Sequence, residues 1–155
     1  MQVTQATKLD EARRYLENAR EILDGVGQEF GYYTDDKPVR EAGHTAWIGI
    51  LFATEYLLDA WKPGCYIPYA KSGEPQRPQF NSYLGCLSQL HRELMMKKPH
   101  TAKLLAKAIK IFRDLYDGFH KSMGYDGRSK VSIIAQNFLD AYEYLSLVEK
   151  IRDEL

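Results

Sequence analysis

The sequence predicts an all-α protein, an up-and-down bundle of four to five helices built as a single domain over residues 1–155. Apolar residues recur at spacings of three and four through most of the chain, which is the period of a helix with one buried face. No segment shows the alternating pattern of a strand. Hydrophobic residues make up 45% and charged residues 27% of the 155 positions, a balance typical of a folded domain with a sizeable core.

The first helix is predicted over residues 8–25. Thr7 and Asp10 resemble a capping box, in which each residue satisfies a backbone N–H of the other. Gly25 and Gly27 suit the end of the helix, where glycine is favoured. The apolar stripe consists of Leu9, Ala12, Leu16, Ala19, Leu23 and Val26.

The second helix is predicted from Val39 to Trp61, with Pro38 in a position that a helix start tolerates. Apolar residues occupy most of its faces, so the helix is either central in the bundle or also buried by a second subunit. Gly43 and Gly49 cost helix propensity but permit close approach of another helix. The main stripe consists of Val39, Ala42, Ala46, Ile50, Ala53, Leu57 and Ala60, and Trp47, Ile48 and Leu51 lie on other faces.

A long loop separates this helix from the second half of the chain. It contains four prolines, Pro63, Pro68, Pro75 and Pro78, which exclude regular structure. Long loops within compact domains often serve binding. The alternative is that the aromatic residues of the loop, such as Tyr66 and Tyr69, anchor it to the bundle.

Three further segments with helical periodicity follow the loop. One begins near Phe80 and stops before Pro99, because proline removes an intrahelical donor. The next is predicted to be capped by Thr101, so one long helix of the bundle is split at Pro99. The last is predicted to be capped by Ser129. Between these two, Gly124 and Gly127 mark a turn.

Charge and composition exclude several classes of protein. Lys plus Arg equals Asp plus Glu at 21 each, so anion binding requires a local patch. The N-terminal residues do not resemble a secretory signal, and Glu55 and Asp59 interrupt the most apolar stretch, so we expect a cytoplasmic protein without a membrane span. We expect Cys65 and Cys86 to be reduced thiols, with a disulfide as the alternative.

Arg113 and His120 are the candidate site residues. Seven residues span nearly two turns of an α-helix, so both side chains are predicted to point the same way from the edge of the buried stripe. A guanidinium can hold a phosphate and an imidazole can transfer a proton, which suits cleavage of RNA through the ribose 2′-OH. The alternative is that Arg113 pairs with a carboxylate and His120 caps the end of the helix.

The second half of the chain, mainly residues 105–152, resembles the HEPN superfamily. The resemblance rests on Arg113, Asp114 and His120, which match that family's Arg, polar residue and downstream His at the long end of their spacing, and on the closing segment "AQNFLDAYEYLSLVE". It implies a small helical bundle, commonly homodimeric, in which some members are metal-independent RNases and others bind nucleotides or partners. It also implies that Arg113 stabilises the phosphate, His120 moves the proton and Asp114 orients one of these two side chains.

Glu41 and His44 form half of a di-iron helix motif. No second half exists elsewhere in the sequence, so we expect no metal and no cofactor. The sequence therefore predicts an RNA- or nucleotide-phosphate-binding helical module, with RNase activity as its catalytic form. The alternative is a non-catalytic homodimeric interaction or structural protein.

Overall fold

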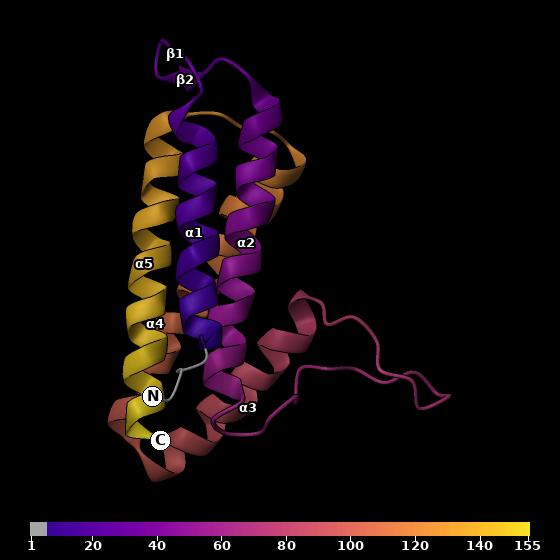
Figure 1. Ribbon diagram of the computed structural model, residues 1–155. Helices are drawn as coiled ribbons and strands as arrows, with labels where there is room; N and C mark the ends of the chain where they lie inside the picture. Colours follow the sequence, from indigo (N-terminus) through magenta and orange to yellow (C-terminus); the bar gives the residue numbers. More distant parts are fainter. Residues whose placement is uncertain (1–5) are drawn as a thin grey trace, which may run out of the picture.

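The computed structural model describes residues 6–155 and confirms the all-α bundle. Four long rods lie side by side with alternating chain direction, and one further helix, α3, tilts away from them at one end (Figure 1). The rods are α1 (Lys8–Asp24), α2 (Asp36–Leu58), α4 (Pro99–Leu115) continued by the π-helix η1 (Tyr116–Tyr125), and α5 (Val131–Glu154); α3 spans Phe80–Lys97.

The first helix has the predicted cap and the predicted close neighbour. The Thr7 side chain accepts a hydrogen bond from the backbone N–H of Asp10, and the Asp10 carboxylate accepts one from the N–H of Thr7. A Cβ placed on Gly49 of α2 would lie 3.0 Å from the carbonyl oxygen of Ala12. The glycine therefore lets α2 approach the backbone of α1, as the sequence indicated.

A short hairpin that the sequence analysis did not predict joins α1 to α2. It consists of β1 (Gln28–Glu29) and β2 (Tyr32–Tyr33), too short to show alternation. Phe30 and Gly31 between them have φ of 52° and 83°, the pattern of a tight hairpin turn. The N–H of Tyr33 donates to the carbonyl of Ser129, and the N–H of Val131 donates to the carbonyl of Gly31. The hairpin is therefore tied to the start of α5.

The central position of α2 accounts for its unusual composition. The helix begins at Asp36, capped by Asp35, and ends at Leu58, three residues before the predicted end at Trp61. It packs against α1, η1 and α5. Trp47 is only 6% exposed, whereas Ile48 is 40% exposed. Burial by the chain's own helices thus explains most of the apolar surface of α2 without a second subunit.

Pro99 separates α3 from α4, as predicted, but two predicted caps are wrong. Pro99 itself is the first residue of α4 and Lys98 is its N-cap. Thr101 therefore lies inside the first turn, where its hydroxyl donates to the Glu154 carboxylate at 2.8 Å. Ser129 does not cap α5 either, because α5 begins after Lys130 and the carbonyl of Ser129 pairs with the hairpin.

The loop after α2 is held by a partly buried charge network. The ammonium of Lys8 donates to Glu55 at 3.0 Å, to Asp59 at 2.8 Å and to the Tyr66 hydroxyl at 3.0 Å. Tyr83 of α3 donates to Glu55 at 2.6 Å, and its ring stacks on that of Tyr66. Burial lowers the pKa of Lys8, but its three hydrogen bonds outweigh burial and raise that pKa overall. Tyr66 thus anchors the loop.

Other loop residues behave differently. Tyr69 is 66% exposed and does not anchor the loop. Cys65 and Cys86 are free thiols, and burial, followed by the neighbouring Cys86, raises the pKa of Cys65 to about 12. Over residues 6–155, the structure contains no helix long and apolar enough to cross a membrane.

Candidate functional site

The predicted pair, Arg113 and His120, opens onto two different hollows. Arg113 lies on α4 and lines a groove between α3 and α4, whereas His120 lies on η1 and lines a hollow beside α2. Hydrogen bonds in a π-helix run from residue i to i+5, which makes its turns wider than those of an α-helix. The seven-residue spacing therefore no longer equals two turns, and the shared direction expected from a regular α-helix does not arise.

The surroundings of Arg113 and Asp114 also differ from those expected. Asp114 is exposed and its carboxylate lies 3.5 Å from the ammonium of Lys110. Within residues 6–155, Arg113 forms no ion pair, so the alternative in which a carboxylate neutralises it is wrong for this part of the chain. The side chain of His120 makes no hydrogen bond to a described residue, so it does not cap a helix end. The catalytic roles of the three residues stay predictions.

The hollow around His120, called the His120 hollow below, has a volume of about 870 Å³. Side chains from α2, from the loop before α3 and from η1 converge on it. They carry two imidazoles, two permanent cations and several aromatic rings, and no carboxylate belongs to the lining among the described residues. The residues that define it are His44, Trp47, Arg77, Tyr116, His120 and Lys121, with Tyr125 at its edge.

Aromatic rings fix the orientation of the His120 imidazole. The ring stacks on Tyr116 with centroids 5.2 Å apart and an interplanar angle of 21°. Tyr125 and His44 meet it edge to face at 4.9 Å and 5.9 Å. Trp47 covers a further side at 6.0 Å. Because four rings surround it, the imidazole of His120 has little freedom to rotate.

Close contact between α2 and η1 brings the two histidines together. A Cβ on Gly43 would lie 2.6 Å from the carbonyl oxygen of Phe119 and 2.8 Å from the N–H nitrogen of Gly124. A Cβ on Gly124 would lie 2.7 Å from the ring of His44. Only glycine fits at both positions without a shift of the backbone or the ring. The two glycines therefore permit the approach that places His44 beside His120.

Burial and neighbouring charges act in the same direction on His120. Burial lowers the pKa of His120, and the cationic forms of His44, Lys121 and Arg77 lower it further. Lys121 lies 3.8 Å from Asp117, whereas Arg77 forms no ion pair with any residue from 6 to 155. The imidazole is thus held in its neutral form at neutral pH.

The two nitrogens of the His120 ring are not equivalent. Nδ1 is buried and has no hydrogen-bond partner among the described residues. Nε2 makes no hydrogen bond within them and is not among the buried unpaired atoms, so it keeps contact with solvent in the hollow. A neutral imidazole with one accessible nitrogen can accept a proton from a bound group.

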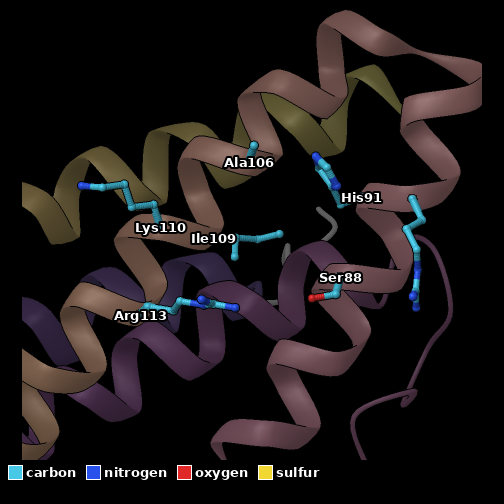
Figure 2. Close-up of a pocket in the computed structure, with 7 residues that line it drawn as sticks. Ser88, His91, Ala106, Ile109, Lys110 and Arg113 are labelled. Atoms are coloured by element: carbon cyan, nitrogen blue, oxygen red, sulfur yellow. The ribbon is translucent and has the colours of Figure 1, made fainter.

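The second hollow, called the Arg113 groove below, has a volume of about 440 Å³ between α3 and α4. The side chain of Arg113 extends from α4 toward the Ser88 hydroxyl of α3, while Lys110 points away from the groove (Figure 2). Ala106 and Ile109 supply its apolar part. His91 and Arg92 of α3 complete the lining, which again contains no carboxylate within the described chain.

Comparison with known proteins identifies a family of unknown function. The family model of a domain of unknown function, DUF5618, matches residues 7–150. The chain belongs to this family. A solved structure of a protein of unknown function from Dyadobacter fermentans is 30% identical, covers 92% of this chain and 94% of its own, and superposes with a TM-score of 0.67. Comparison with curated proteins gave no match.

The DUF5618 assignment leaves the HEPN resemblance a prediction, because neither comparison points to that superfamily. Sequence reasoning also missed two residues of the site. His44 was considered as half of a di-iron motif with Glu41, and Arg77 was not singled out from the proline-rich loop. The sequence contained one signal for this contact. In both Gly43–His44 and Gly124–Tyr125, a glycine that permits close approach stands next to an aromatic ring.

Metal ligands do not gather at this site. His44 and His120 are two imidazoles without a nearby carboxylate or thiolate. Throughout residues 6–155, the structure contains no group of three or more His, Cys, Asp and Glu side chains that could hold a metal ion. Glu41, the other half of the motif with His44, is exposed and does not line the hollow.

Proposed function

We propose that this chain binds nucleotide phosphates, including those of single-stranded RNA, in the His120 hollow. One observation carries the proposal: two imidazoles, Arg77 and Lys121 converge on a hollow whose described lining has no acid. Its volume, about 870 Å³, lies within the range of small-ligand sites. Cations attract phosphate, and aromatic rings offer stacking surfaces to bases.

Each part of a nucleotide has a suitable partner in the hollow. Arg77 forms no ion pair within residues 6–155 and can take the phosphate without first breaking an internal contact. Tyr125 is 62% exposed and offers its ring for stacking with a base. A bound phosphate would offset the repulsion among His44, His120 and Lys121, so binding and protonation of the histidines should favour each other.

We extend the proposal to cleavage of RNA without a metal, because the rings of His44 and His120 lie 5.9 Å apart in one hollow. Neutral His120 would take the proton of a ribose 2′-OH through Nε2, and the 2′-oxygen would attack the adjacent phosphorus. Protonated His44 would donate its proton to the departing 5′-oxygen. The products are a 2′,3′-cyclic phosphate and a 5′-hydroxyl end, so atoms and protons balance without a further reactant.

Calorimetric titration with uridine monophosphate tests the binding proposal. We expect Arg77→Ala and His120→Phe each to weaken binding at least tenfold, because each removes a group that faces the phosphate. Arg14→Ala is the matched control, since Arg14 pairs with Glu11 on the outer surface of α1. Absence of binding to the wild-type protein at millimolar ligand would disprove the proposal.

Incubation of a labelled RNA oligonucleotide with EDTA tests cleavage separately. We expect the wild-type chain to produce cyclic-phosphate ends, and His120→Gln and His44→Gln each to reduce the rate at least a hundredfold. An oligonucleotide with a single deoxyribose at the cleaved position should resist. If wild type and His120→Gln give equal rates, His120 is not the base and cleavage by this site is excluded.

A non-catalytic homodimer is the second candidate, favoured by the outward-facing Ile48 of α2. Its side chain is 40% exposed at the His120 hollow, whereas the neighbouring Trp47 and Ile50 are buried. The test substitutes Ile48 and not the neighbouring Trp47, because Trp47 is a core residue. Light scattering should give the mass of a dimer for the wild-type chain and of a monomer for Ile48→Lys. A monomeric wild type, or an unchanged dimer in the variant, would contradict this candidate.

A further inference from the structure

We infer that the Arg113 groove holds a second phosphate of the same strand whose first phosphate occupies the His120 hollow. This inference rests on the proposed function and narrows its ligand. The preferred ligand is then a single-stranded oligonucleotide that crosses both hollows, rather than a mononucleotide. Three features support it: the two helical segments that both hollows share, the unneutralised charge in the groove and the distribution of acids.

The same two helical segments, α3 and α4 continued by η1, contribute residues to both hollows. Phe80 stacks on Tyr116 with centroids 4.0 Å apart and on Phe112 at 5.4 Å. Arg113 directly follows Phe112, and Tyr116 lies one turn further along. Phe112 is fully buried, whereas Phe80 and Tyr116 line the His120 hollow, so a strand that leaves this hollow toward Arg113 starts from these two partly exposed rings. Such rings accept bases of any sequence by stacking.

The separation of the two hollows suits nearby phosphates of one strand. Asn81 lines the His120 hollow and Ser88 lines the Arg113 groove, and both lie on α3. Seven residues of an α-helix advance about 10 Å. An extended strand can place two nearby phosphates at such a separation, so no bend of the strand is needed.

The charge in the groove comes from both helices and is not neutralised internally. Arg92 lies on α3 and Arg113 on α4. Within the described residues 6–155, neither guanidinium forms an ion pair. Lys110 contributes less, because its ammonium points away from the groove and lies 3.5 Å from Asp114 (Figure 2). The Arg113 guanidinium and the Ser88 hydroxyl thus face a site that can take an anion (Figure 2), and Arg92 adds to its lining a positive charge that no described residue pairs.

The placement of acidic residues supports one binding surface across both hollows rather than scattered basic residues. The whole chain contains equal numbers of acidic and basic residues, 21 of each. Even so, the described linings of both hollows contain cations and histidines but no Asp or Glu. Adjacent hollows of one sign produce a local field that a neutral protein otherwise lacks.

Fluorescence anisotropy with labelled oligouridylates of increasing length tests the inference, with uridine monophosphate as the short ligand. We expect affinity to rise with length. Arg92→Ala combined with Arg113→Ala should weaken binding of a twelve-nucleotide strand at least tenfold and leave binding of the monophosphate unchanged. Loss of the one phosphate held in the groove should also reduce the slope of log affinity against log salt by about 0.7.

The control removes the same charge from another surface. Arg14→Ala combined with Lys107→Ala breaks exposed pairs with Glu11 and Glu143, and should leave binding of the twelve-nucleotide strand within about twofold. Thermal unfolding followed by circular dichroism confirms that both double variants fold.

The possible failures are distinguishable. If the monophosphate binds but affinity does not rise with length, or if the groove variant binds the long strand as tightly as wild type, the groove is not a second subsite. The proposed function then stands. If neither ligand binds the wild-type chain, the proposed function fails and the inference fails with it.

Discussion

Two charged clusters lie along α2, and they differ in how completely the protein satisfies them. Near the end of the helix, Glu55 and Asp59 share the ammonium of Lys8 and two tyrosine hydroxyls. Nearer its start, His44 faces His120 among cations, and Nδ1 of His120 has no partner within residues 6–155. The first cluster holds a loop in place, whereas the second leaves a buried nitrogen beside a hollow unpaired within the described chain.

Because of this difference, substitutions of the polar side chains in the two clusters should change the free energy of unfolding in opposite directions. A charge network with all partners present resists loss of any member, since the remaining groups are left buried and unpaired. A buried nitrogen without a hydrogen bond costs about 1–3 kcal/mol, so its removal is tolerated. Perturbed groups of the second kind gather at functional sites. Substitutions in the two clusters should therefore separate folding from binding.

The largest expected effect comes from Gly43→Ala, which would break the second cluster. The new Cβ would lie 2.6 Å from the Phe119 carbonyl oxygen, and such overpacking costs about 1–3 kcal/mol. Gly85→Ala on α3 is the matched control, because a Cβ at that position would meet no other part of the described chain within 4 Å. Alanine there should stabilise the helix by about 0.5–1 kcal/mol. Urea unfolding that gives both variants the same sign would contradict the close contact.

Lys8→Met should have the next largest effect, because it breaks the first cluster. The substitution leaves the carboxylates of Glu55 and Asp59, 17% and 30% exposed, without their shared cation. Lys8 itself is 39% exposed, so solvent screening reduces the cost to about 1–2 kcal/mol in the free energy of unfolding. Arg14→Met, which breaks an exposed pair with Glu11, should change the urea midpoint little. Equal losses in both variants would show that the network adds nothing beyond a surface ion pair.

His120→Phe should have the smallest effect on stability and the opposite direction. At pH 7 the free energy of unfolding should stay unchanged or rise by less than about 1 kcal/mol, because an unpaired buried nitrogen is removed. Equilibrium unfolding in urea measures the change. A clear loss of stability would show that the imidazole is satisfied in solution.

The variant His120→Phe also tests the comparison through the pH dependence of its stability. Burial and electrostatic repulsion from His44, Lys121 and Arg77 place the pKa of His120 below its ordinary value of 6.5. As the pH falls below 6.5 the unfolded chain takes up a proton before the folded chain does, so the wild type loses stability until the pH reaches the lowered pKa. His120→Phe lacks this contribution and should lose less stability between pH 7 and pH 5. Parallel pH profiles would contradict the lowered pKa.

Local signals were sufficient to predict most of the fold. Helical periodicity, the capping residues Thr7 and Asp10 and the break at Pro99 all act within a few positions of where they occur in the sequence. Gly43 and Gly49 were also interpreted correctly as points of close approach, because a missing side chain has a simple steric meaning. The errors at Thr101 and Ser129 arose where a residue bonds to a distant part of the chain instead of to its own helix.

The candidate site depended on contacts that no local pattern contains. His44 and His120 are far apart in the sequence and meet only because α2 crosses η1 at Gly43 and Gly124. Arg77 reaches the hollow from a loop whose position depends on the Lys8 network and the start of α3. Sequence reasoning proposed His120 as a site residue at the edge of the buried stripe, and that role stays a prediction; the direction of its side chain relative to Arg113 required knowledge of the helix type.

The π-helix has a consequence for how such motifs are read in other proteins. In an uninterrupted α-helix, side chains seven positions apart point within about 20° of each other. Here the wider winding from Tyr116 onward separates them, and each faces its own recess. A spacing of seven residues can thus correspond either to two side chains that act at one site or to two side chains that make separate contacts along an extended ligand. The helix type of the backbone between the two residues, and not the number of intervening residues, decides between these arrangements.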